Sequence, residues 1–268
     1  MNKYWHVFQI GIQNTLVYRV NFLFRASFGL ISLMATIYLW RAIYASHPDR
    51  TGVAGYTLAG MTSYYLLSTV VDALTAVADD DWQIAEDIKD GNISQLLLKP
   101  MDYLAYRLSL FLAGRVVYTA AAMLPVAAML LLQHQFFVLP PDGLTLAVFA
   151  TSTVLTALLQ FLISYTMALL AFWVLEVSTF IFILFAFEYL AGGHLFPLDI
   201  LPPMLAQVLN LTPFPYQLYF PVSVYLGRVT GVELWRGLAV QAAWVLVMFG
   251  VARCVWRRGI RHYSAVGG

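Results

Sequence analysis

The stretch "LTLAVFATSTVLTALLQFLISYTMALLAFWVLEVSTFIFILFAFEYLAG", residues 144–192, carries only two charged side chains, Glu176 and Glu188. As one α-helix it would be roughly 74 Å long at about 1.5 Å per residue, whereas the hydrocarbon core of a bilayer is about 30 Å thick. The stretch must therefore fold back on itself, and we expect the turn near Trp173 to Glu176. It predicts two membrane-spanning helices joined by a very tight connection.

The composition of the whole chain also indicates a membrane protein. Of its 268 residues 61% are hydrophobic and 11% are charged, whereas a soluble domain carries about 25% charged residues. Further apolar stretches long enough to cross a bilayer precede and follow residues 144–192. We therefore predict an all-α polytopic membrane protein that forms a single domain over residues 1–268. Its six predicted transmembrane helices lie at 22–45, 53–78 and 103–132, twice within 144–192, and at 233–256.

Several classes of protein are disfavoured by the same numbers. The net charge is +1 and no basic stripe accompanies it, so no nucleic-acid partner is expected. The only cysteine, Cys254, has no partner for an intrachain disulfide and suits a small apolar position on a helix. The five histidines lie far apart without the spacing of metal ligands, so no metal site is predicted. These histidines are His6, His47, His134, His194 and His262.

Residues 2–20 are predicted to form an amphipathic helix rather than a span. Their apolar side chains step by three and four residues and give one stripe along a helix, while polar side chains occupy another face. This pattern suits an interfacial helix in the headgroup plane, and it suits equally well a helix packed on the rest of the protein. The stripe consists of Trp5, Phe8, Ile12, Leu16 and Val20.

Residues 193–232 combine many prolines with little charge. Six of the eleven prolines are here, yet Asp199 and Arg228 are the only charged side chains. A solvated loop would be more polar, so we predict short re-entrant helices that enter the membrane partway. A folded cap outside the membrane, with an apolar underside, fits nearly as well.

Positive charge orients the predicted spans. Six crossings place both termini and residues 79–102 on one side, and that side holds eleven of the fifteen basic residues. Because basic residues mark the cytoplasmic side, both termini and residues 79–102 are expected in the cytoplasm, and residues 193–232 face outward. Basic residues at the end of the chain are expected to bind anionic membrane lipid. They are Arg257, Arg258 and Arg261.

Residues 79–102 hold seven of the fourteen acidic residues. These acids may be read in three ways: as a solvated loop, as an Asp-rich magnesium site of a membrane prenyl- or phosphatidyl-transferase, or as a docking element for a cytoplasmic partner. Apolar residues in the same segment argue against mere solvation. In the docking element Gly91 ends one short helix in the left-handed conformation and Asn92 starts another. Its isoleucines would then fill a groove of the partner.

Three segments resemble the permease subunits of type-2 ATP-binding-cassette (ABC) exporters of bacteria. They are "YRVNFLFR" (18–25), "EDIKDGNISQLLLKPMDYLAYRL" (86–108) and the pair "GGHLFPLDILP" (192–202) and "TPFPYQLYFPVSVYLG" (212–227). The resemblance implies a permease subunit in the bacterial inner membrane that forms the translocation pathway. It also implies two cytoplasmic ATPase subunits and a second permease, identical or homologous, as partners. ATP and Mg²⁺ would bind to the ATPases, since this chain has no phosphate-binding G-x-x-x-x-G-K-[ST] loop.

The resemblance also assigns roles to residues. It implies that the cytoplasmic segment couples to the ATPase and that the outward segment closes a gate. The coupling residues would be Glu86, Asp87, Ile88, Lys89, Gly91, Leu96, Leu97, Lys99 and Pro100. The gate residues would be Gly192, Gly193, Phe196, Pro197, Pro213 and Pro215.

Three charged side chains lie inside predicted spans. Ionisable groups at membrane depth are costly and usually paired, so we expect a salt bridge between Asp72 and Arg115. For Glu188 we expect a hydrogen bond to a neighbouring helix end, with a role in binding substrate or protons as the alternative. An ion-coupled secondary transporter that uses Asp72 and Glu188 is a further functional hypothesis. No catalytic residue is predicted for the transport function.

Overall fold

The computed structural model of the chain describes residues 3–46, 52–77, 80–174 and 176–263, without the side chains at 19, 80, 81, 132 and 134. The described residues are almost all helical. The β-structure among them is limited to one isolated bridge between Val53 and Tyr56. The all-helical fold class predicted from the composition is confirmed.

Four helices are long and apolar enough to cross a membrane. They correspond to the predicted first, third, fourth and sixth spans. The fourth continues into a 3₁₀ turn, η2 (Leu169–Phe172), so that its apolar stretch runs over Gly143–Phe172. The four helices are α2 (Arg19–Ser46), α6 (Tyr103–Leu132), α7 (Gly143–Ala168) and α11 (Gly231–His262).

The predicted second and fifth spans are also helices, but shorter ones. Helix α3 (Leu58–Thr75) has 18 residues and α8 (Ser178–Ala191) has 14. At about 1.5 Å per residue they measure roughly 27 Å and 21 Å, somewhat less than the apolar core of a bilayer. Both helices exist where the sequence predicts spans, but the count of six crossings stays a prediction.

The connections explain where these helices begin. The predicted turn near Trp173 to Glu176 is confirmed, because η2 ends before it and α8 begins after it; position 175 lies outside the described residues. Residues 53–56 were expected inside the second span, yet they form a bridged turn. The side chain of Thr57 then caps α3 by accepting a hydrogen bond from the Gly60 N–H at 3.1 Å.

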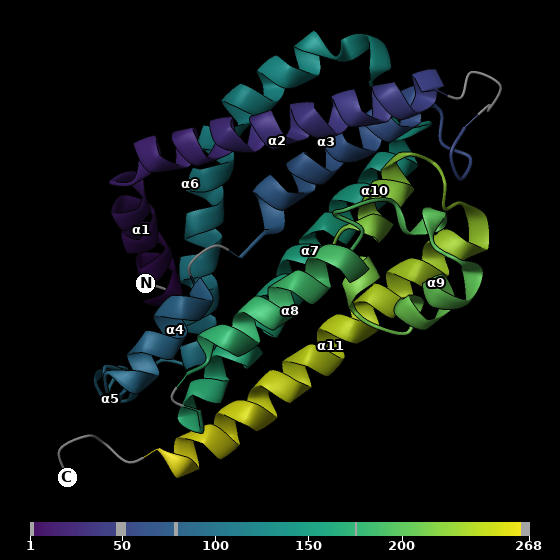
Figure 1. The fold of residues 1–268 in the computed structure, drawn as a ribbon. Coiled ribbons are helices and arrows are strands. Elements are labelled where there is room, and N and C mark those ends of the chain that lie inside the picture. The colour runs from purple at the N-terminus through teal and green to yellow at the C-terminus, as the bar shows by residue number, and fades with distance from the viewer. Residues whose placement is uncertain (1–2, 47–51, 78–79, 175, 264–268) are drawn as a thin grey trace.

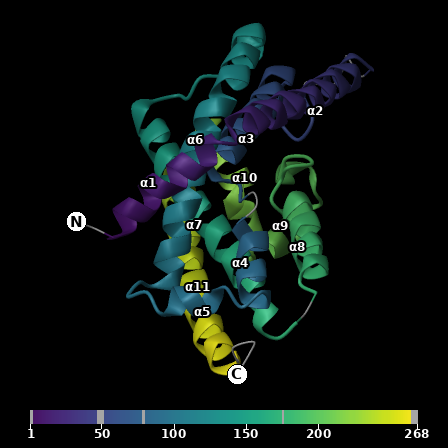
Figure 2. The ribbon, with the colours of Figure 1, turned by 90° about the vertical axis from the view of Figure 1, so that its left-hand side faces the viewer.

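Helix α7 lies at the centre of the packing. Helix α11 packs along one side of it, and α3 with α10 (Tyr219–Tyr225) packs on another. Helices α1 (Lys3–Leu16) and α2 pack against α6, as Figures 1 and 2 show. The N-terminal helix is therefore packed on the protein, and its place in the headgroup plane stays a prediction.

Buried apolar side chains form two main clusters near opposite ends of the molecule. One cluster joins α2, α3 and α10 and includes Tyr64, Leu66 and Val222. The inner cluster joins α4, α6, α7, η2 and α11 and includes Tyr165 and Phe172. Packing thus fixes the two ends of the long helices to different neighbours.

The proline-rich segment forms four short helices, in agreement with the prediction of broken helices there. Only α10 among them is enclosed, since its residues 220–225 are all buried, whereas α9 buries none of its own. The entry of these short helices into the membrane stays a prediction. The first three are η3 (Leu198–Ile200), α9 (Pro203–Asn210) and η4 (Phe214–Gln217).

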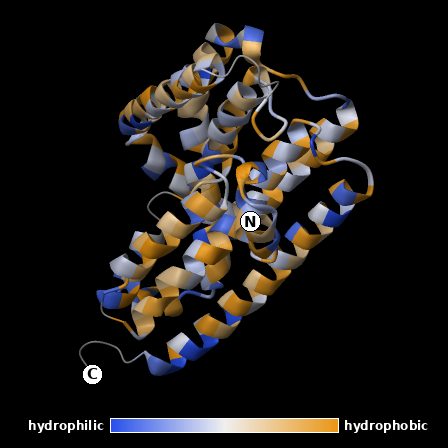
Figure 3. Cartoon of the chain, turned by 45° about the vertical axis from the view of Figure 1, so that its right-hand side comes forward, coloured by the Kyte–Doolittle hydropathy of each residue, from blue (hydrophilic) through white to orange (hydrophobic). Residues whose placement is uncertain are grey.

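Both ends of the described chain meet helices α4 (Asp80–Lys89) and α5 (Ile93–Leu97) at one end of the molecule (Figure 1). The backbone N–H of Asp102 donates to the Tyr4 hydroxyl at 3.1 Å, and the Ser94 and Tyr263 hydroxyls lie 2.9 Å apart. The end of α11 there is hydrophilic, while its shaft is mostly hydrophobic (Figure 3). The termini and the acidic segment therefore lie at the same end, as the predicted topology requires.

Candidate functional site

Helices α4 and α5 form a compact hairpin, which we call the inner hairpin (residues 80–100). Gly91 joins the two helices with φ +77°, in the left-handed region that favours glycine. The Gly91 carbonyl accepts a hydrogen bond from the Ser94 N–H at 3.1 Å and another from the Tyr263 hydroxyl at 3.4 Å. The predicted left-handed helix end at Gly91 is confirmed.

The apolar face of the inner hairpin is turned toward the rest of the protein. Ile84, Ile88 and Ile93 are buried in the inner cluster, beside Leu169 and Phe172. These isoleucines are therefore not exposed to fill a partner's groove, and the coupling role of Ile88 stays a prediction. Ile84 and Ile88 are four residues apart and share one face of α4, and the protein's own core covers that face.

Asp87 also faces inward. Its carboxylate forms an ion pair with Arg107 of α6 and accepts a hydrogen bond from the Tyr103 hydroxyl at 3.3 Å. Arg107 is 4% exposed and donates further hydrogen bonds to Tyr103 and to the Gln83 carbonyl. A buried guanidinium requires such partners. Asp87 thus ties the hairpin to α6, and its contact with the ATPase stays a prediction.

The outer side of the hairpin is exposed and chemically mixed. We call it the docking face and define it by Glu86, Lys89, Asp90, Leu97, Leu98 and Lys99. Leu98 is 88% exposed, unusual for leucine. Pro100 is exposed beside this face, whereas Leu96 packs partly against the inner cluster. Of the nearby acids, Asp79 and the side chains of Asp80 and Asp81 lie outside the described residues.

Asp102 follows the hairpin and caps α6. Its carboxylate accepts from the Ala105 N–H at 2.9 Å and pairs with Arg253 of α11. Burial opposes ionisation of Asp102, but the hydrogen bonds from Arg253 and Ala105 outweigh it and lower the pKa of the carboxyl below its usual value. Asp102 thus joins the start of α6 to the end of α11.

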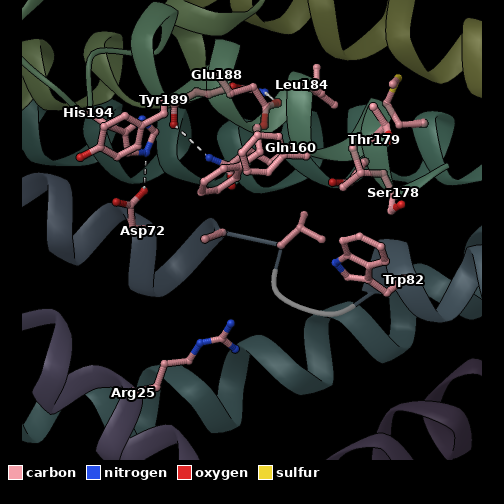
Figure 4. Close-up of a pocket in the computed structure, with 18 residues that line it drawn as sticks. Arg25, Asp72, Trp82, Gln160, Ser178, Thr179, Leu184, Glu188, Tyr189 and His194 are labelled. Atoms are coloured by element: carbon pink, nitrogen blue, oxygen red, sulfur yellow. Dashed lines mark hydrogen bonds and ion pairs between the residues drawn. The ribbon is translucent and has the colours of Figure 1, made fainter. Parts of the chain in front are cut away.

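A cavity of about 820 Å³ opens between α3, α7 and α8 (Figure 4). We call it the lateral pocket. One end is polar: Asp72 Oδ1 lies 3.1 Å from His194 Nε2, and the Gln217 side-chain amide donates to Glu188 Oε1 at 2.9 Å. Gln160 of α7 lies beside this end. Asp72 and Glu188, far apart in sequence, therefore face one pocket.

Aromatic side chains form much of the remaining wall of the lateral pocket. They come from α4 and α8, and α8 packs only lightly on its neighbours, so that Phe182 is 70% exposed. Arg25 of α2 reaches the pocket from the side away from Glu188 and His194 (Figure 4). The aromatic residues are Trp82, Phe182, Phe185 and Tyr189.

A family model described as ABC-2 family transporter protein matches residues 30–267. The chain belongs to the ABC-2 transporter family. This ABC-2 chain is therefore a multi-pass membrane protein and a transport subunit of the permease type, in a family that works with ABC ATPase subunits. The resemblance stated from the sequence is confirmed. No curated protein and no solved structure matches the chain.

The proline-rich segment of the ABC-2 chain, residues 193–232, is held by a second carboxylate. Asp199 accepts hydrogen bonds from the Tyr56 and Tyr219 hydroxyls, each at 2.8 Å, and lies 3.5 Å from Arg228 Nε. The Arg228 guanidinium stacks 3.8 Å from the centre of the Tyr56 ring. The two lone charges of residues 193–232 thus pair with one another. We call these four residues the outer cluster.

The predicted gate residues lie around this cluster but do not meet at one point. Gly192 ends α8, and Gly193, with φ +94°, accepts a hydrogen bond from the Tyr64 hydroxyl at 2.7 Å. Pro197 is buried before η3, and Phe196 beside it is partly exposed. Pro213 and Pro215 begin η4. The gating role of these residues stays a prediction.

The intramembrane charges differ from the prediction in one respect. Asp72 pairs with His194, so the expected salt bridge between Asp72 and Arg115 is wrong; Arg115 lies over the Tyr118 ring at 4.9 Å. The expected hydrogen bond of Glu188 to a helix end is confirmed, because Gln217 is the last residue of η4. His194 was missed, although it follows the Gly192–Gly193 pair closely after Glu188.

Proposed function

We propose that the chain is the permease subunit of an ATP-driven exporter in the bacterial inner membrane. It crosses the membrane six times, with α3 and α8 as the short second and fifth spans and both termini in the cytoplasm. Two permeases, identical or homologous, assemble with two cytoplasmic ABC ATPases, which bind ATP and Mg²⁺. The permease performs no chemistry itself.

The inner hairpin carries this proposal. Its inner face is fixed to α6, α7 and α11 by buried isoleucines and by the Asp87–Arg107 pair. Its docking face remains open, with charged and apolar side chains next to each other, which is typical of the rim and core of an interface. A hairpin held this firmly moves with the helices, so a force applied to the docking face reaches the membrane segment.

The packing supports a route from the hairpin to the outer side. Helix α4 contacts α7 and η2, and α7 contacts α3 and α10. ATP-driven closure of the two ATPases would draw the hairpins together and shift these helices relative to α8, which is loosely packed. The segment at 193–232 would then open, and the substrate would leave outward or into the outer leaflet.

Two other hypotheses make different demands. An Asp-rich magnesium-dependent transferase would use the acids between Asp79 and Asp90, yet Asp87 among them is bound by Arg107. An ion-coupled secondary transporter would use Asp72 and Glu188, and their meeting in one pocket favours keeping this as the second candidate. It predicts transport that persists without ATP and depends on a proton or sodium gradient.

The docking face is tested by co-purification of an ABC ATPase with the tagged permease. The double variant Glu86→Lys, Leu98→Asp changes both the charge and the apolar contact of the docking face. We expect most of the co-purified ATPase to be lost from it. Glu233→Lys is the matched control, because Glu233 is an exposed carboxylate at the other end, on α11. Equal ATPase recovery with both variants contradicts the proposed coupling surface, provided that both melt at the temperature of the parent protein.

A further inference from the structure

The lateral pocket has the size of a small-molecule site. Its volume of about 820 Å³ lies within the range of roughly 300–1,000 Å³ that is usual for ligand pockets. Walls from α2, α3, α4, α7 and α8 surround it, and α8 contributes three aromatic side chains beside aliphatic and polar ones.

The polar end of the pocket is negatively charged. Asp72 and Glu188 together contribute two negative charges, and His194 contributes at most one positive charge. Arg25 comes from the opposite side of the pocket (Figure 4). An anionic ligand would be repelled by two carboxylates here. A wholly apolar ligand would displace water from these carboxylates without replacing the hydrogen bonds that the water makes.

Asp72 has room for a further partner. Among the described residues, His194 is the one side chain that contacts its carboxylate, through Oδ1, and the Asp72 side chain is 34% exposed. His194 is held in place by the Tyr189 ring, which stacks on it with ring centres 5.3 Å apart. The second carboxylate oxygen of Asp72 therefore has no side-chain partner among the described residues.

Aromatic faces next to a carboxylate bind cations with an apolar body. The rings of Trp82, Phe185 and Tyr189 line the same cavity as Asp72, and a ring face attracts a positive charge within about 6 Å. We propose that the lateral pocket is the substrate site and that its substrates are amphipathic organic cations, with the positive charge at Asp72 and the apolar body along α8. This deepens, and rests on, the proposed transport function.

The test uses two ions of nearly equal size and opposite charge, tetraphenylphosphonium and tetraphenylborate, and the purified permease in neutral detergent. Equilibrium dialysis should show tighter binding of the cation. Asp72→Asn should weaken cation binding about tenfold, which corresponds to about 1.4 kcal/mol, and should not weaken anion binding. The control Asp142→Asn changes an exposed capping carboxylate outside the pocket and should leave both affinities unchanged.

Equal affinity for the two ions, or full cation affinity in Asp72→Asn, overturns the proposal. If Asp72→Asn does not fold, two other variants replace it. Asp72→Glu should keep cation binding, because the carboxylate remains. Phe185→Ala should weaken binding of both ions, because it removes apolar contact. Unchanged binding in Phe185→Ala likewise counts against the pocket. No ATPase is present in this assay, so a negative result here does not affect the conclusion of the co-purification experiment. A negative co-purification result likewise does not affect the conclusion of the binding assay.

Discussion

The inner hairpin and the lateral pocket each contain a carboxylate beside the membrane helices, but the protein surrounds the two carboxylates differently. Asp87 in the hairpin receives donors from Arg107 and from Tyr103. Asp72 in the pocket has His194 alone among the described side chains. Asp87 anchors an element through two donors on Oδ2, one of them charged, whereas Asp72 has a single contact, through Oδ1, among the described side chains and lines an open cavity.

The outer cluster follows the pattern of the hairpin. Asp199, like Asp87, lies between tyrosine hydroxyls and an arginine. Tyrosine and arginine together supply two donors to Asp87 Oδ2 and donors to both oxygens of Asp199, and each guanidinium lies over a tyrosine ring. Each end of the molecule thus contains a carboxylate bound by tyrosine and arginine. In the pocket between them, the Asp72 carboxylate keeps one oxygen for a ligand.

The largest effect on stability is expected from Arg107→Met. The change keeps an apolar side chain in the buried position but removes the guanidinium, so that Asp87 loses its ion pair and keeps only the hydrogen bond from the Tyr103 hydroxyl, which itself loses the Arg107 donor. Breaking a buried ion pair costs about 3–5 kcal/mol, and because Asp87 is 21% exposed we expect the lower end, about 3 kcal/mol. Thermal or denaturant unfolding in detergent measures this.

The control for that variant is Arg258→Met, at an exposed position near the end of α11. It removes the same charge and should change stability little. If the two variants unfold alike, Asp87–Arg107 does not anchor the hairpin. The double variant Arg107→Met, Asp87→Leu should recover part of the loss, because no unpaired charge then remains.

A smaller effect is expected from Asp199→Ala in the outer cluster. The hydroxyls of Tyr56, which is buried, and of Tyr219 lose their acceptor, and Arg228 loses its ion pair. An unsatisfied buried donor costs about 1–3 kcal/mol, and since Asp199 is partly exposed we expect about 1–2 kcal/mol. Tyr56→Phe should lose less than Asp199→Ala, since it removes only one of these bonds. An unchanged unfolding midpoint in Asp199→Ala would show that the cluster does not hold the outer segment.

Local features of the fold were readable from the sequence. Asp102 as a helix cap, Gly91 as a left-handed helix end and the turn after Phe172 each depend on a few neighbouring residues and on known backbone preferences. The apolar lengths likewise gave the four long helices. The prolines of residues 193–232 indicated short helices, because proline beyond the first turn removes a backbone hydrogen bond and destabilises a helix.

The tertiary pairs of the site were not readable. Asp72 and His194 are separated by 122 residues, and no spacing rule connects them. The inward turn of Asp87 depends on where α6 places Arg107. The late start of α3 has a similar cause: Arg228 donates to the carbonyls of Ala54 and Gly55, so a turn replaces the helix that the apolar sequence predicted there.

The smallest effect is expected from Gly91→Ala, which changes the turn of the inner hairpin without touching its anchors. The added Cβ has space, since its nearest neighbour is the Tyr263 hydroxyl at 3.6 Å, but φ at Gly91 is +77°. The left-handed conformation costs a residue with a Cβ about 1 kcal/mol, so we expect a loss of about 1 kcal/mol in the free energy of unfolding. Gly143→Ala is the matched control, because no heavy atom lies within 4 Å of its Cβ position and its φ lies outside the left-handed region. If Gly143→Ala lowers the free energy of unfolding as much as Gly91→Ala does, the left-handed conformation at Gly91 does not constrain the hairpin turn. The hairpin would then not be the rigid element that we contrast with the open pocket.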